Sequence, residues 1–584
     1  MNSRVLLFFV MVVAVSYPAR AQNQNNSDRK IVISSRLKQF AAVAGKLPRG
    51  VLSGSLQNML EIADRFEQLN TPLQNLDSAR LEHIGQELQT YHSAVSGGPS
   101  SRGTPVNNSK ADFLFSTLGG FTQYETSTAW CGDHVVVAFA DSGSILESLL
   151  FGRGGLSTTA AAFSTDGGNS FVDSGFVNPG SNATNQLQGN GVVNCSNENT
   201  FYYTQIFATG RSSQPFASVA LSKSTDGGQT WEDPIPAVSL DGGTHNTDKP
   251  WSTIDPTDRE RLYVTYTDFD QSNTVCPKSQ RSAIEMVVSS DGGNTWSMPA
   301  VVDQSCMTPP MSPVVQGSQV MVDSHGAVYV AWEAYTSTAP PISREMRIVK
   351  SVDHGVTFAP FVKIDMVTPV GIADITGFSS PIFPILQGNV LDNEWPSLAI
   401  DRSGTGTDGT VYVAWNDGRF HQVPDRLSLT GVYGYSTIVV SRSTDGGKTW
   451  SPVTRVNNSP IVLGDGRSTD EFQPAVAVDT DGSVAVCWFD RRADPENYLI
   501  GRSCSLSRDQ GATWTDRPVT HDHWPPIKAT DLFDTGGTFG DYNQLTSDFE
   551  KIYPGFLGAY NSVTTTNVPV PNQDIFLISI PKDE

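Results

Sequence analysis

Carboxylate residues recur at two fixed positions of a repeated strand pattern, and their types and spacing could support acid–base chemistry. Neighbouring carboxylates raise one another's pKa, which is how one site obtains a protonated acid beside an ionised base. Glycosidic hydrolysis needs such a pair, and a calcium ion would use the same residue types. Each single residue could equally cap a turn. The residues before the first strand of a unit are Glu125, Asp248, Glu394, Glu471 and Asp541, and those after the second strand are Asp141, Asp268, Glu333, Asp417 and Asp490.

Arginines and aromatic residues accompany these carboxylates. Arg419 follows a second strand in WNDGR, and Arg491 and Arg492 follow the next one in WFDRRADPENY. A guanidinium pairs well with a carboxylate-bearing ligand, although these arginines could simply neutralise neighbouring aspartates. Trp251, Trp395 and Tyr542 could stack on sugar rings or belong to the core. The histidines of HDHW, 521–524, could bind a metal or lie in a surface loop.

The strand pattern that positions these residues occurs seven times, beginning near residues 135, 201, 262, 328, 411, 484 and 552. In the fifth unit the four strands are WPSLAID, TVYVAW, STIVVSRS and SPVTRV. Short strands repeating at such a long period indicate the blades of a propeller. We therefore predict an all-β, seven-bladed β-propeller, or six blades if the first and last units share one. The last unit lacks its fourth strand, which we expect from residues 111–118.

A turn-forming octapeptide lies between the third and fourth strands of six units, with STDGGKTW, 443–450, as its clearest copy. Its Asp can accept hydrogen bonds from the turn's own N–H groups, and its Gly supplies a positive φ. Six equivalent turns cannot all be one site, so the motif is structural. Because it marks one face of the propeller, a site at the axis is expected on the opposite face.

The octapeptide is the Asp-box, and from about residue 130 to 584 the chain resembles the sialidase superfamily of Asp-box propellers. The resemblance implies a Tyr–Glu nucleophile pair, an Asp acid/base and an arginine triad. On the matching motifs these are Tyr542 in GDYNQL, Glu394 with Arg419 in NEWPSLAI…VYVAWNDGR, and Asp141 in AFADSGS, with Arg491 or Arg492 as a further arginine. Glu125, Asp248, Glu471 and Asp541 would contact the substrate. The chain departs from the family in QYETSTAW, where Glu125 stands in place of an Arg-Ile-Pro arginine.

Three functions follow as alternatives. The first is a sialidase-like glycoside hydrolase acting on terminal, acidic sugars, with a glycan substrate and no cofactor. The second is a non-catalytic propeller that binds glycan or protein, with calcium where the carboxylates hold it. The third is a polysaccharide lyase. A formal net charge of −21 disfavours nucleic acid and anionic membrane partners.

The N-terminal region predicts export. A basic start, an apolar run and Ala19-Arg20-Ala21 are typical of a signal peptide ending at residue 21, which implies a secreted or periplasmic protein without membrane insertion. Residues 22–110 are expected to form a lead-in, helical over 52–94, with a linker over 96–105. The propeller would then span 111–584. Six cysteines suggest disulfides with fifteen connectivities, among which Cys487–Cys504, Cys131–Cys195 and Cys276–Cys306 are the local pairs.

Overall fold

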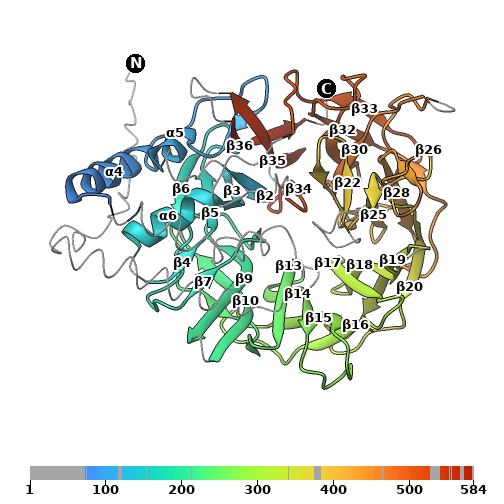
Figure 1. Ribbon diagram of the computed structural model, residues 1–584, viewed down its shortest axis with the longest axis horizontal. Helices are drawn as coiled ribbons and strands as arrows, with labels where there is room; N and C mark the ends of the chain where they lie inside the picture. Colours follow the sequence, from blue (N-terminus) through green and yellow to red (C-terminus); the bar gives the residue numbers. More distant parts are fainter. Residues whose placement is uncertain are drawn as a thin grey trace, which may run out of the picture.

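The sheets of the chain stand in a ring around a central axis (Figure 1). This computed structural model describes residues 73, 75–115, 122–152, 154–211, 214–339, 341–373, 383–462, 466–526, 540–551, 553, 555–565 and 571–581. The helices described from end to end are α4 (Ser78–Tyr91), α5 (Ser109–Asp112), α6 (Ser142–Phe151) and one 3-10 turn, Phe113–Phe115. The fold is therefore an all-β propeller, as predicted.

Within the described residues, six sheets have four antiparallel strands each and form six blades. The first three are β2 (Gln123–Cys131), β3 (His134–Asp141), β5 (Thr159–Ser164) and β6 (Val172–Phe176); β13 (His245–Asp255), β14 (Asp258–Asp270), β15 (Arg281–Ser289) and β16 (Ala300–Cys306); and β17 (Val314–Val322), β18 (Val328–Ser337), β19 (Ser343–Ser351) and β20 (Val362–Val367).

The remaining blades follow in chain order. They are β24 (Ser397–Ile400), β25 (Val411–Asp417), β28 (Thr437–Ser443) and β29 (Thr454–Arg455); β30 (Glu471–Val478), β31 (Val484–Asp490), β32 (Gly501–Ser507) and β33 (Thr515–Pro518); and β34 (Leu545–Ser547), β35 (Phe556–Thr565) and β36 (Pro571–Ile580) with β1 (Thr104–Pro105).

A further sheet of seven strands takes six strands from the chain between the β2 and β13 blades and one, β4, from between β3 and β5 of the first blade. Its strands are β4 (Leu156–Ser157), β7 (Gln186–Leu187), β8 (Val192–Cys195), β9 (Phe201–Arg211), β10 (Gln214–Ser224), β11 (Ile235–Pro236) and β12 (Leu240–Asp241). Tyr203 of β9 belongs to the same buried cluster as Ala129 of β2, so this sheet packs on the first blade.

Closure of the ring differs from the prediction for 111–118. Thr104 and Pro105 pair with Leu577 and Phe576, so β1 is the outer strand of the last blade. Residues 109–115 are helical because the Asn108 side chain caps α5 by accepting from the backbone of Lys110. The edge that closes the sheet therefore comes from inside the expected linker.

The second strand of the last blade also begins later than IYPGF, 552–556. Asp548 accepts hydrogen bonds from the backbone of Glu550 and Tyr553, which holds this segment in a turn. β35 consequently starts at Phe556.

The Asp-box copies are turns stabilised by their own side chains. In 443–450 the backbone of Thr449 donates to Asp445 at 2.9 Å, and that of Gly447 donates to Ser443 Oγ at 2.9 Å. Hydrogen bonds from the Thr449 hydroxyl and then the Thr449 backbone, followed by that from the Ser443 hydroxyl, hold the pKa of Asp445 below its usual value. The backbone of Gly167 in another copy donates to Asp133 between β2 and β3. The Asp-boxes and the turns between first and second strands therefore share one face, here called the Asp-box face.

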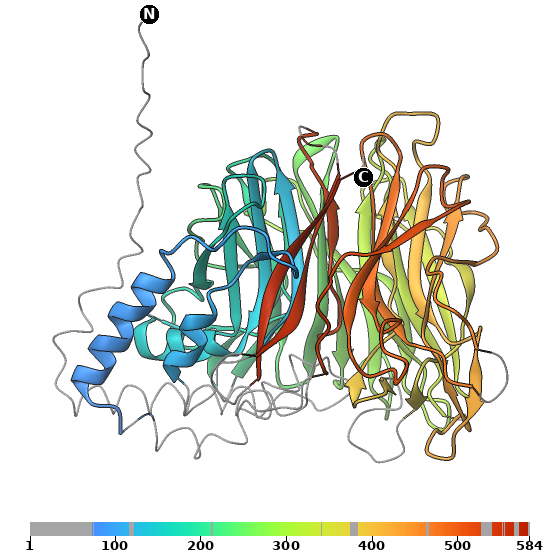
Figure 2. The ribbon, with the colours of Figure 1, turned by 90° about the horizontal axis from the view of Figure 1, so that it is seen from above.

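Helix α4 lies against the outside of the first blade, beside α6 (Figure 2). Asp77 caps its N-terminus by accepting from Arg80, and Leu81, Ile84 and Leu88 are buried on one face. They pack with residues of α6 that include Ile145 and Leu149. The helical face predicted for this second run is confirmed, whereas the first run and the signal peptide lie outside the described residues.

All six cysteines form disulfides, in the three local pairs that the sequence suggested: Cys131–Cys195, Cys276–Cys306 and Cys487–Cys504. The first bond joins β2 to β8 and so links two neighbouring sheets. The third joins directly paired residues of β31 and β32. The bonds therefore reinforce the contacts between and within sheets.

Candidate functional site at the propeller axis

Strained backbone gathers where the innermost strands approach the axis. The register of β2, β13, β17 and β30 shifts at a bulge of two residues. Each bulge holds one residue at positive φ, with values of 55° for Glu125, 48° for Lys249, 70° for Gly317 and 50° for Gln473. A non-glycine residue in this region costs ~1–3 kcal/mol and persists where the surroundings impose it, often at functional sites.

Lys249 is the centre of this region. Its ammonium lies 2.9 Å from Glu125 Oε1 and 2.5 Å from Asp541 Oδ2, and it donates to Asn190 Oδ1. The Lys249 side chain is only 3% exposed. Burial alone would lower the pKa of Lys249, but the charges of Asp541 and Glu125 outweigh burial and raise it. One ammonium therefore contacts three other segments of the chain and forms ion pairs with two buried carboxylates.

A cavity of about 30 Å³ borders Lys249, here called the axial cavity. It is lined by Trp251, Trp395, Asp541 and Tyr542, among others. A water needs ~10–15 Å³ of such space, so the cavity has room for two or three water-sized groups. Gly317 makes this arrangement possible, because a Cβ there would lie 2.3 Å from Trp395 Cγ.

Four buried polar atoms on side chains that line the axial cavity have no hydrogen-bond partner within the described residues. They are Ser318 Oγ, Trp395 Nε1, Asn416 Oδ1 and Gln473 Oε1. A buried polar atom without a partner costs ~1–3 kcal/mol. Two of these atoms can donate and three can accept, which suits a hydroxyl-bearing ligand or ordered water.

Tyr542 forms part of the wall of the axial cavity. Its hydroxyl donates to Gly191 O at 3.2 Å, and its ring meets Trp251 edge-on at 5.5 Å between centroids. Burial, followed by the charge of Glu125, raises the pKa of Tyr542 well above its usual value. The hydroxyl is therefore protonated at neutral pH and needs a base before it can attack a substrate.

Of the predicted site residues, Glu125, Asp541 and Tyr542 thus meet at the axis, and Asp248 lies beside them. Asp248 accepts from the backbone of Lys249 at 2.9 Å and from Gln316 at 3.1 Å.

Glu394 occupies a different, fully buried cluster. It forms an ion pair with Arg344 and accepts from the backbone of Val370. Glu333 is close enough for the two carboxyls to affect each other, and burial together with Glu394 raises the pKa of Glu333 to about 8. The described contacts of Glu394 and those of Tyr542 have no residue in common.

The predicted arginines and Glu471 lie in separate contacts between strands. Arg419 pairs with Asp417 and Asp365, and Arg492 pairs with Asp490 and Asp516. Arg491 is fully buried, with Nη1 3.6 Å from Asp470 Oδ2.

Glu471 accepts from Asn457 and Thr469 at 2.8 and 2.9 Å. The strand-end carboxylates therefore form several paired clusters rather than one ring.

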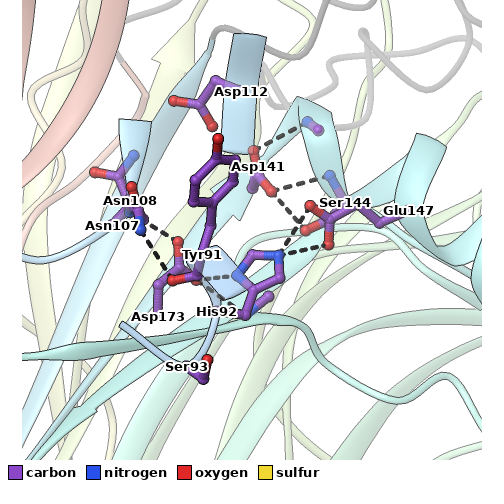
Figure 3. Close-up of polar contacts among 12 residues, drawn as sticks. Tyr91, His92, Ser93, Asn107, Asn108, Asp112, Asp141, Ser144, Glu147 and Asp173 are labelled. Atoms are coloured by element: carbon purple, nitrogen blue, oxygen red, sulfur yellow. Dashed lines mark hydrogen bonds and ion pairs between the residues drawn. The ribbon is translucent and has the colours of Figure 1, made fainter. Parts of the chain in front are cut away.

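Asp141 caps helix α6 (Figure 3). Its carboxylate accepts from the backbone of Gly143 and Ser144 and from the side chain of Gln123. Nearby, His92 Nε2 lies 3.1 Å from Glu147, and His92 Nδ1 lies 3.5 Å from Asp173. Asp112 also approaches this group through Gln123. The cluster joins the lead-in to the first blade.

The stability of the protein should fall as pH rises from ~4 to ~7 because of this cluster. Burial, followed by Glu147, raises the pKa of Asp141 to about 7, and burial with Asp574 raises that of Asp112. The folded state thus binds protons that the unfolded state has released, so each carboxyl loses stabilising effect as it ionises. Asp141→Asn keeps a capping oxygen and should flatten the decline in melting temperature measured by calorimetry.

The matched control is Asp509→Asn. Hydrogen bonds, of which that from the Thr513 side chain is the strongest, lower the pKa of Asp509 to about 2. Ionisation of Asp509 therefore changes the stability of the protein only at pH values below ~4. An unchanged pH profile in Asp141→Asn would contradict the assignment of the decline to this carboxyl.

Among the described residues, no group of three or more His, Cys, Asp or Glu side chains is arranged to hold a metal ion. His521 and His523 therefore have no such cluster around them, and Trp524 of HDHW is buried and stacks on Tyr560. No helix in the described part of the chain is long and apolar enough to cross a membrane.

Sequence reasoning missed Lys249, Asn190 and Gln473. A signal was present for two of them, because Lys249-Pro250 and Gln473-Pro474 place proline inside an innermost strand. Proline cannot donate to the strand ladder and is confined to edges and bulges. Bulges at these residues could therefore have been predicted.

Comparison with known families identifies one Asp-box directly. The family described as BNR/Asp-box repeat matches residues 441–452. Together with the ring of sheets and the turn geometry, this match defines the chain as an Asp-box β-propeller. The prediction of a propeller with Asp-box turns is therefore confirmed. No curated protein matches the chain significantly.

Solved structures with similar architecture are distant. An intramolecular trans-sialidase from leech is 13% identical with a TM-score of 0.38, covering 85% of this chain and 72% of that chain. An α-L-arabinofuranosidase from Fusarium graminearum is 12% identical with a TM-score of 0.37, covering 65% and 89%. A protein of unknown function from Dyadobacter fermentans is 13% identical with a TM-score of 0.38, covering 79% and 96%.

Proposed function

We propose that the protein is a sialidase-like glycoside hydrolase that acts on terminal, acidic sugars of glycans, with the axial cavity as its reactive centre. The observation that carries this proposal is the convergence of strained bulge residues, a tyrosine and a carboxylate on one cavity, with a second carboxylate, Glu125, paired to Lys249 of the cavity wall. Glu125 and Lys249 are held at positive φ there, and Asp541 and Tyr542 border the same space. Strain of this kind is retained where the surroundings impose it.

In this proposal Tyr542 is the nucleophile and Glu125 is the carboxylate that assists it. Glu125 is the acid whose charge raises the pKa of Tyr542 most, whereas Glu394 is paired with Arg344. Lys249, which lines the cavity, would be the cation nearest to an acidic sugar there, in the absence of the arginine that the first strand lacks. Since the cavity measures only about 30 Å³, a substituent would enter it while the sugar ring lies outside.

Three further statements belong to the proposal. The seven-stranded sheet would be the seventh blade, because β8, β9, β10 and β11 run in the same antiparallel order as a blade. Residues 1–21 would be a cleaved signal peptide, the lead-in would span 22–110 and the propeller 111–584. The protein would be secreted or periplasmic, which agrees with the pairing of all six cysteines.

A panel of exo-glycoside substrates with product analysis tests the proposal. Release of a terminal acidic sugar is expected, and Glu125→Gln should reduce turnover far more than Glu394→Gln. The reverse order would return the assisting role to Glu394, and an unsaturated uronide product would indicate a lyase. No release from any glycoside would contradict a hydrolase.

The alternative, a non-catalytic propeller that binds glycan or protein, is favoured by the pairing of the strand-end carboxylates. Glu394, Asp417 and Asp490 each lie in an ion pair with arginine and are almost completely buried. Binding to a glycan array without product formation would support this function.

A further inference from the structure

A second, larger cavity of about 390 Å³ runs along the axis on the Asp-box side, here called the axial channel. The later residues of the innermost strands and the turns that follow them line it, including Pro256, Thr480 and Ser547. Trp251 and Gln319 line both this channel and the axial cavity, so the two spaces adjoin. The channel therefore adjoins the proposed reactive centre, but most of its lining residues belong to the face that bears the Asp-boxes.

Three cations from alternate blades line the channel. Arg259 lies in β14, Arg402 follows β24, and Lys551 follows β34. The Lys551 ammonium is 3.4 Å from the carbonyl oxygen of Arg402, which brings two of these blades together. In a chain with a net charge of −21, three converging cations are an unusual local arrangement.

Arg402 has weak partners for a charged group. Its Nε donates to Val322 O at 2.6 Å, while Nη2 reaches the sulfur of Met321 at 3.9 Å. Burial lowers the pKa of Arg402 to about 10, although Asp255 and Asp323 act against it. A guanidinium bordering a cavity with a thioether as partner can gain from an anionic ligand.

The carboxylates of the acidic residues that line the channel already accept hydrogen bonds from backbone N–H groups. Asp479 accepts from the backbone of Thr480 and Gly555, and Asp548 accepts from that of Gly132, Glu550 and Tyr553. Their oxygens are therefore oriented by backbone N–H groups. Arg259 is the cation with a side-chain counter-ion, Glu550 at 3.0 Å.

The walls add hydroxyl groups, among them Thr128, Ser252, Ser397 and Thr546. A volume of about 390 Å³ lies within the range of ~300–1,000 Å³ typical of small-molecule sites. We propose that the axial channel is a binding site for a small polyhydroxylated carboxylate, such as an acidic monosaccharide. Arg402 and Lys551, with Arg259, hold the carboxylate, and the hydroxyl-bearing walls contact the rest.

Titration calorimetry of the full chain with sodium glucuronate at low ionic strength tests this proposal. We expect binding that weakens with added salt and is at least ~10-fold tighter than for glucose. The variant Arg259→Ala/Lys551→Ala should lose at least ~10-fold in affinity. Lys448→Ala is the matched control, since Lys448 is an exposed Asp-box residue that does not line the channel. Its affinity should stay unchanged.

The same variants separate this site from the reactive centre. Hydrolysis by Arg259→Ala/Lys551→Ala should match that of the unaltered protein, because neither residue lines the axial cavity. Undiminished glucuronate binding in that variant would place the ligand at Lys249 instead and overturn the proposal. Equal affinity for glucose, an equal loss in Lys448→Ala, or no glucuronate binding at all would overturn it as well.

Discussion

Replacing Lys249 by methionine is expected to lower the free energy of unfolding by ~3–5 kcal/mol. Methionine retains most of the length of lysine but leaves Glu125 and Asp541 as uncompensated carboxylates in a region that is almost fully buried. Since positive φ is equally unfavourable for lysine and methionine, the backbone contributes little to the difference. Denaturation in guanidinium chloride, followed by tryptophan fluorescence, measures the change.

Two variants make this prediction specific. Lys363→Met removes an exposed ammonium, 3.8 Å from Glu345, and should cost less than ~1 kcal/mol. Glu125→Gln combined with Lys249→Met removes one unpaired charge and should recover part of the loss, as a double-mutant cycle would show. A Lys249→Met protein as stable as Lys363→Met would contradict a central role for the ion pair.

The architecture was predictable because its signals repeat. The turn seen at 443–450 occurs in six copies, and strands such as VYVAW recur along the chain. Repeated segments reveal a regular spacing, which a single residue cannot do. Pairing of Cys487 with Cys504 followed from the same strand alignment, since the two residues face each other in neighbouring strands. Repetition thus predicted the four-stranded blades, the Asp-box face and the Cys487–Cys504 disulfide.

Ring closure and the site depend on contacts that no repeat encodes. Thr104–Pro105 is too short to show a strand pattern, yet it completes the last blade through pairing with Leu577. Glu394 and Tyr542 both match family motifs. The motifs do not show which side chains surround each residue in the fold, and Glu394 forms an ion pair with Arg344. Lys249 had a readable signal in the following proline, although only the folded ring brings it to Glu125 from 124 residues away.

Loss of the Tyr542 hydroxyl is expected to have the largest effect on activity. Tyr542→Phe should reduce turnover by at least ~1,000-fold if this oxygen attacks the substrate, because no other group replaces a lost nucleophile at the same position. Stability should change by only ~1 kcal/mol, since within the described part of the chain the hydroxyl makes one hydrogen bond, to Gly191 O at 3.2 Å. Initial rates on the substrate found in the glycoside panel, with melting temperatures alongside, measure both effects.

Tyr412→Phe is the matched control for this prediction. Tyr412 lies in strand β25 and does not line the axial cavity. Its hydroxyl is also buried and has no hydrogen-bond partner within the described residues. Rates should therefore remain at the level of the unaltered protein in Tyr412→Phe and fall only in Tyr542→Phe. Because both changes remove one oxygen from a tyrosine, a difference between them would reflect chemistry at the axis rather than packing. Equal rates in the two variants would leave Tyr542 as a wall of the cavity and favour the non-catalytic propeller.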